Sequence, residues 1–138
     1  MSMIKLVIFD VDGTLVDSET VYVKAAIKNT EVNHYNIPMS AIMGIIGQNR
    51  VAGQKLIEST QDDSFDYDKY LEDFRKIRDE LLEKEPYKLK KGAINILNYC
   101  KEHDIKMAIA TSTARDKQTK VLTQLGIIDY FNSSIIAR

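Results

Sequence analysis

The chain has 138 residues, of which 28% are charged and 44% hydrophobic, and its net charge is −1. This composition is ordinary for a globular protein, and so small a net charge gives no general attraction to nucleic acid or to an anionic membrane. A single cysteine, Cys100, excludes an internal disulfide and fits a reducing compartment. The sequence shows neither the pattern of a signal peptide nor the roughly 20 apolar residues of a transmembrane helix. We therefore expect a cytoplasmic protein that binds neither nucleic acid nor membranes.

The first predicted element is a short strand that ends in two carboxylates. The apolar run from Leu6 to Phe9 is typical of a buried strand, and it is followed by Asp10, Asp12 and Gly13. An Asp-Gly turn explains Asp12, but it does not explain Asp10 directly after the apolar run. Two carboxylates this close together attract a cation, and the carboxyl ends of strands are where open α/β sheets bind ligands. This stretch predicts a site for a hard cation beside a carboxylate nucleophile.

Four helices are predicted in the middle of the chain. Their expected ranges are Ser18 to Val32, Ser40 to Ile46, Val51 to Ser59 and Asp66 to Lys84. The last is the longest, and its apolar residues recur at spacings of three and four, which predicts one buried face. Pro86 ends it.

The last third of the chain returns to alternating helices and strands. A helix is expected from Ala93 to Glu102, a strand from Ile105 to Ala110, a helix from Ala114 to Leu125 and a third strand from Ser134 to Ala137. In a parallel sheet the ends of the first two strands, marked by Asp10 and Thr111, are neighbours. The predicted fold class is α/β, with a core formed by residues 1–15 and 88–138 and a helical insertion at 16–87.

The two carboxylates have the chemistry that phosphoryl transfer would use. Asp10 can act as a nucleophile that forms an aspartyl-phosphate, and Asp12 can protonate the leaving oxygen and then deprotonate a water molecule. Mg²⁺ would neutralise the charge of the phosphoryl group.

Four parts of the sequence resemble one known superfamily. The sequence from Phe9 to Ser18 resembles the first signature motif of the haloacid dehalogenase-like (HAD) hydrolases. The segments Lys91–Leu97 and Ile109–Thr113 resemble the second motif and the helix before it, and the helical insertion is similar to the α-helical cap of the beta-phosphoglucomutase-like and phosphoglycolate-phosphatase-like branch. The resemblance implies a Rossmann-like parallel-sheet core with an inserted helical cap.

The resemblance also implies roles for individual residues. Asp10 matches the nucleophile and Asp12 the general acid/base, and both match Mg²⁺ ligands. Thr111 and Ser112 match the residues that bind the phosphoryl group through a hydroxyl and a backbone N–H. Arg50 matches a substrate-binding arginine of the cap. On the residues alone, Thr111 is better explained as the cap of a strand end, and Arg50 could equally be a solvated side chain at a helix N-terminus.

The function implied is a Mg²⁺-dependent phosphatase for a small phosphorylated metabolite. The second carboxylate, Asp12, favours phosphoryl transfer over dehalogenation. Tyr22 stands where the sugar-phosphate mutases of this branch tend to carry a histidine, so a mutase is the alternative rather than the first choice. A phospho-acceptor receiver domain is disfavoured, because it has no large helical insertion after its first strand.

The superfamily's third and fourth motifs, a lysine and an acidic pair, are expected after the third strand and are not found up to Arg138. We therefore expect these residues to be the N-terminal part of a longer phosphatase and to have little activity alone. The alternative from another class is a non-catalytic binding or assembly module. The superfamily's sheet places its fourth and fifth strands on the far side of the first strand, and without them the first strand would be a bare edge, which could pair with a second copy of the chain.

Overall fold

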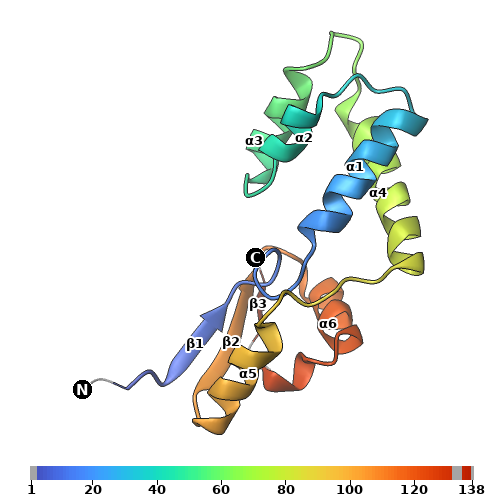
Figure 1. The fold of residues 1–138 in the computed structure, drawn as a ribbon. Coiled ribbons are helices and arrows are strands. Elements are labelled where there is room, and N and C mark those ends of the chain that lie inside the picture. Colours follow the sequence, from blue (N-terminus) through green and yellow to red (C-terminus); the bar gives the residue numbers. More distant parts are fainter. Residues whose placement is uncertain (1–2, 132–134, 138) are drawn as a thin grey trace. The chain divides into compact units, whose positions relative to one another are not determined.

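The computed structural model describes residues 3–131 and 135–137. Its elements, in chain order, are β1 (Leu6–Phe9), α1 (Glu19–Val32), α2 (Met39–Gly44), α3 (Arg50–Glu58), α4 (Tyr67–Lys84), α5 (Ala93–Glu102), β2 (Lys106–Thr111), α6 (Arg115–Gln124), a 3₁₀ turn (Ile128–Tyr130) and β3 (Ile135–Ala137) (Figure 1). They form two compact units. The sheet unit comprises Met1–Ser18 and Tyr87–Arg138, and the helical unit comprises Glu19–Pro86.

The sheet unit is built on three parallel strands in the order β1-β2-β3. Phe9 pairs with Ile109, and Thr111 pairs with Ala137, so the carboxyl ends of β1 and β2 meet at the same edge of the sheet. The chain leaves this unit after β1 and re-enters it before α5. Here Asp17 N–H donates to the Lys88 carbonyl and Lys90 N–H to the Leu15 carbonyl, each at 2.8 Å. These bonds join the two segments of the unit.

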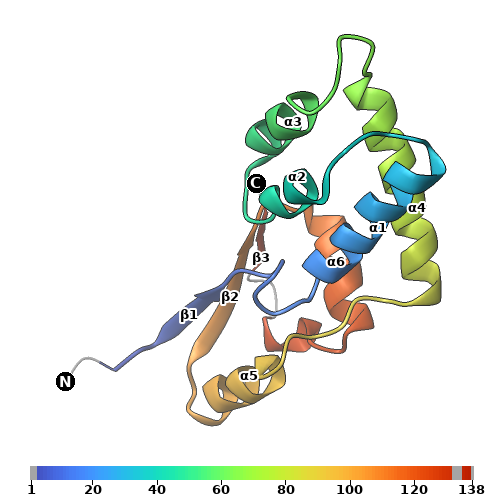
Figure 2. The ribbon, with the colours of Figure 1, turned by 45° about the horizontal axis from the view of Figure 1, so that its top comes forward.

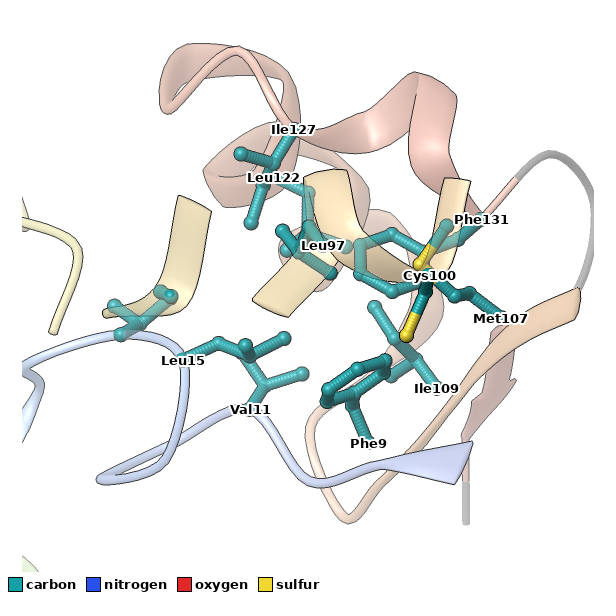
Figure 3. Close-up of a cluster of buried hydrophobic side chains, with 12 residues drawn as sticks. Phe9, Val11, Leu15, Leu97, Cys100, Met107, Ile109, Leu122, Ile127 and Phe131 are labelled. Carbon is teal, nitrogen blue, oxygen red and sulfur yellow. The ribbon is translucent and has the colours of Figure 1, made fainter. Parts of the chain in front are cut away.

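Helices α5 and α6 cover one face of this sheet, and the core lies beneath them (Figures 1 and 3). Phe9 and Ile109 point into this core, and Leu97 of α5 and Leu122 of α6 meet them there. The rings of Phe9 and Phe131 pack edge to face with their centroids 6.1 Å apart. The core therefore fixes the two strands whose ends carry the candidate site.

The expectation that β1 is a buried strand is wrong for half of its side chains. Leu6 is 50% exposed and Ile8 is 55% exposed, whereas Phe9 is buried. Successive side chains of a strand point to opposite faces, and among the described residues the helices cover only the face of Phe9. In addition, β1 lies at the edge of the described sheet, so only one of its sides is paired.

The helical unit has a core of its own. Helix α1 packs along α4, and α2 and α3 follow each other beside them (Figure 2). Ala25, Ala26, Ile57, Tyr70 and Phe74 are central members of this core. The longest helix, α4, buries Tyr70, Phe74 and Ile77, as their spacing predicts.

Every predicted helix and strand is present, and the bounds differ by at most two residues at either end. Ser134, the expected start of the third strand, lies outside the described residues. The α/β class with a parallel sheet and a helical insertion is confirmed. Among the residues that the structure describes, no helix has the length and apolar character needed to cross a membrane.

Candidate active site

The turn after β1 presents Asp10 and Asp12 to solvent. The buried Val11 lies between them, and its carbonyl accepts hydrogen bonds from the backbone N–H groups of Thr14, Leu15 and Val16 at 3.0–3.1 Å. Gly13 has a φ of 76°, a left-handed conformation that favours glycine. Its N–H donates to the Val16 carbonyl at 2.8 Å. Val11 thus anchors the turn in the core, and both aspartate side chains are left exposed.

Hydroxyl groups hold both carboxylates. The Thr14 hydroxyl donates to Asp10 Oδ2 at 3.3 Å, within the same turn. The Thr113 hydroxyl donates to Asp12 Oδ2 at 3.1 Å, across 101 positions of sequence. The second bond joins the end of β1 to the loop after β2. The structure therefore brings together the two segments that carry the predicted catalytic residues.

Thr111, at the end of β2, is buried and held from two sides. Its hydroxyl oxygen accepts from the Thr113 N–H at 3.1 Å, and its hydroxyl hydrogen is donated to Gln118 Oε1 on α6 at 3.3 Å. Gln118 is only 2% exposed. A buried amide that meets a hydroxyl in this way fixes the rotamer of Thr111.

The donor set fits a hard cation in part. Asp10 and Asp12 offer exposed carboxylate oxygens, and the Asp12 carbonyl accepts no backbone hydrogen bond from the described residues. These are oxygen ligands of the kind that Mg²⁺ prefers, and Mg²⁺ usually keeps several waters and binds substrate phosphate oxygens besides. Within residues 3–131 and 135–137, no cluster of three or more acidic, histidine or cysteine side chains is arranged to hold a metal ion.

The other two predicted site residues, Ser112 and Arg50, lie in different units of the chain. Ser112 is exposed beside Thr111 in the sheet unit. Arg50 belongs to the helical unit, where it is exposed in the first turn of α3, directly after the N-cap Asn49. The Asn49 side chain accepts from the Ala52 N–H at 2.9 Å.

Sequence reasoning assigned no role to Thr113 or Gln118. For Gln118 a signal exists: it lies four residues before the buried Leu122, so it belongs to the face of α6 that packs on the sheet. A polar residue on that face needs a partner, and Thr111 is the partner. No comparable signal marks Thr113, because its bond to Asp12 depends on the pairing of β1 with β2.

Comparison with known proteins identifies the family to which this chain belongs. The model of the haloacid dehalogenase-like hydrolases matches residues 7–138. The chain belongs to this family. The resemblance drawn from Phe9–Ser18 and the second motif is thereby confirmed.

Solved structures of this HAD family have the same fold. One is a candidate beta-phosphoglucomutase from Thermotoga maritima, with 25% identity and a TM-score of 0.68 over 97% of this chain and 61% of that one. Another is a predicted phosphoglycolate phosphatase from Haemophilus somnus, with 20% identity and a TM-score of 0.71 over 99% of this chain and 64% of that one. A HAD-like hydrolase from Streptococcus pneumoniae has 18% identity and a TM-score of 0.75 over 98% of this chain and 61% of that one. The HAD chain described here thus spans about three fifths of these proteins. No curated protein matches its sequence.

Proposed function

We propose that this HAD chain carries the nucleophile and the acid/base of a Mg²⁺-dependent phosphatase that acts on a small phosphorylated metabolite. The observation that carries the proposal is the meeting of Asp10 and Asp12 with Thr111 and Thr113 at one edge of the sheet. The membership of the hydrolase family supports the reaction class.

In the proposed reaction, an Asp10 carboxylate oxygen attacks the phosphorus atom. The bond from phosphorus to the substrate oxygen breaks, and Asp12 donates a proton to that oxygen, so that an alcohol and an aspartyl-phosphate form. Asp12, now ionised, removes a proton from water, which attacks the phosphorus and releases inorganic phosphate and the Asp10 carboxylate. When bound, Mg²⁺ would offset the negative charge that the carboxylate and the phosphoryl group bring together. Asp10, Asp12 and the Asp12 carbonyl are the groups that would hold it.

Thr111 would bind the phosphoryl group, and the Ser112 N–H would assist it. A hydroxyl has one hydrogen, and in the structure the hydrogen of Thr111 is donated to Gln118 Oε1. When Thr111 donates this hydrogen to a phosphoryl oxygen, Gln118 Oε1 loses its donor, and a turn of the amide would let its NH₂ group donate to the hydroxyl oxygen. An amide suits both states.

The test is Mg²⁺-dependent phosphate release from p-nitrophenyl phosphate by the protein expressed from its whole reading frame, with Asp10→Asn as the matched variant. We expect release by the wild type, a loss of at least about a thousandfold in Asp10→Asn, and a covalent phosphoryl adduct by intact mass only in the wild type. We expect the 138-residue chain, assayed in parallel, to be much slower. The absence of release and adduct in the whole protein would instead support a non-catalytic module.

A sugar-phosphate mutase is the second candidate, and the likeness to the Thermotoga maritima protein favours it. Tyr22 argues against it, because the sugar-phosphate mutases of this branch tend to carry a histidine near this position. Incubation with β-glucose 1-phosphate separates the two: a phosphatase releases inorganic phosphate, and a mutase forms glucose 6-phosphate.

A further inference from the structure

The sheet unit places a buried amide next to the candidate active site. Among its described residues, the buried side chains that carry an amide or a hydroxyl are Thr111 and Gln118, which are 7% and 2% exposed. Gln118 lies one turn before Leu122 of the core, on the face of α6 that packs on the sheet. An apolar side chain would fill such a position without the cost of burying an amide. The packing of α6 therefore does not explain the presence of a glutamine.

Three hydrogen bonds connect this amide to the candidate acid/base. Gln118 Oε1 accepts from the Thr111 hydroxyl at 3.3 Å. The Thr111 hydroxyl oxygen accepts from the Thr113 backbone N–H at 3.1 Å, and the Thr113 hydroxyl donates to Asp12 Oδ2 at 3.1 Å. This hydrogen-bond relay therefore begins at a buried amide and ends at an exposed carboxylate.

Gln118 is the fixed end of the relay. Its side chain lies in the close-packed interior, whereas Ser112 is exposed and Thr113 is half-buried, so packing alone does not fix the loop after β2. Thr111 must adopt one particular χ1 rotamer to accept from the Thr113 N–H, and a threonine has more than one available. In the structure, that rotamer is also the one that donates to Gln118. The bond to Gln118 therefore stabilises the conformation of the loop.

We propose that Gln118 is a positioning residue, which aligns the phosphoryl-binding hydroxyl of Thr111 and the acid/base Asp12 together through this relay. Gln118 acts through Thr111 and does not itself contact the substrate. This inference rests on the proposed function, because it adds a residue to the same reaction.

The first test measures hydrogen exchange of single amides by NMR in the 138-residue chain. Gln118→Met keeps the length of the side chain and removes its amide. We expect exchange of the Thr113 amide to become about tenfold faster in this variant, because Thr111 no longer holds the loop. Gln124→Met, the same change at an exposed position of α6, is the matched control and should leave this exchange unchanged.

The Ile109 amide of β2 shows whether the variant stays folded. We expect its exchange to change much less than that of Thr113 in Gln118→Met. Equal acceleration at both amides would show general destabilisation and overturn the proposal, and so would unchanged exchange at Thr113.

The second test is a double-mutant cycle on phosphate release by the whole protein. We expect Gln118→Met to lower kcat about tenfold with KM nearly unchanged, because Thr111 and Asp12 are then misaligned in the transition state. In a Thr111→Val background, Gln118→Met should have no further effect, since the residue through which it acts is already altered. A second tenfold loss in the double variant would show that Gln118 acts independently of Thr111 and would overturn the proposal.

The two tests separate this inference from the proposed function. Phosphate release by the wild type, with Thr113 exchange unchanged in Gln118→Met, would defeat the inference alone. The absence of phosphate release from the wild type would defeat the proposed function, and the exchange measurement would still decide whether Gln118 orders the loop.

Discussion

At the scale of single residues, the proposed reaction depends most on the arrangement of Asp12. A general acid must keep its carboxylate aimed at the leaving oxygen, and Asp12 is exposed, so packing does not hold it. The hydroxyl of Thr113 does so through a single hydrogen bond of 3.1 Å. Thr113 is thus a positioning residue for the proposed reaction.

Replacing Thr113 tests this role. Thr113→Val keeps the shape and removes the hydroxyl, and we expect kcat for phosphate release by the whole protein to fall about tenfold with little change in KM, because substrate binding does not use this bond. Thr113→Ser keeps the hydroxyl and should stay close to the wild type. An equal fall in both variants would show that the methyl group, and hence packing, is what matters.

The predictability of the site also differs from residue to residue. Asp10 and Asp12 could be predicted as candidates, because they follow an apolar strand at the carboxyl end where open α/β sheets bind ligands. The bond from Thr111 to Gln118 could be predicted only in part: the spacing of Gln118 from Leu122 places it on the packed face of α6, but its partner depends on how α6 lies on the sheet.

At the scale of elements, β1 carries a candidate catalytic residue and is also an apolar strand at the edge of the described sheet. Its carboxyl end carries the candidate nucleophile, and it also forms an edge of the described sheet with Leu6 and Ile8 exposed. An apolar edge strand is prone to pair with another strand. We propose that the 138-residue chain associates with a second copy through β1.

Leu6→Lys is the variant that tests this association. A charge on the exposed face of the strand should disfavour pairing, so we expect the sedimentation coefficient at high protein concentration to fall toward that of a monomer. Val32→Lys, at another exposed apolar position at the end of α1, is the matched control and should leave association unchanged. If both variants lower association equally, net charge rather than the strand edge is responsible.

At the scale of the whole molecule, we expect the helical unit to be sensitive to alkaline pH. The helical unit contains tyrosines whose folded pKa is raised: burial raises the pKa of Tyr22 to about 12, and burial with the bond to Asp73 raises the pKa of Tyr35 to about 12. A raised folded pKa stabilises the fold fully below the unfolded value of 10.0, and this contribution is lost as pH rises toward 12. Alkaline pH should therefore destabilise the helical unit.

Methyl NMR spectra recorded between about pH 9 and pH 12 provide the measurement. We expect the Ile57 methyl of the helical unit to move to its unfolded position as pH rises above about 10, and Tyr22→Phe to shift this loss to higher pH. Tyr99→Phe, at an exposed position of the sheet unit, is the matched control. Identical alkaline profiles for the wild type and Tyr22→Phe would contradict the assignment.

The two cores differ in whether one continuous segment of the chain supplies them. Every member of the helical core lies between Tyr22 and Leu81. The sheet core, in contrast, takes its members from both 1–18 and 87–138. A segment that holds a whole core can fold alone, and one that holds half of a core cannot. We expect a peptide of residues 19–86 to unfold cooperatively in urea and to show the methyl shifts of the intact chain, and residues 87–138 alone to be unfolded.

Phe74→Ala should abolish folding of the excised helical unit, since such a truncation costs about 3–5 kcal/mol and so small a domain has little stability to lose. An unstructured 19–86 peptide would mean that the helical core depends on the sheet unit, despite sharing no member with its core.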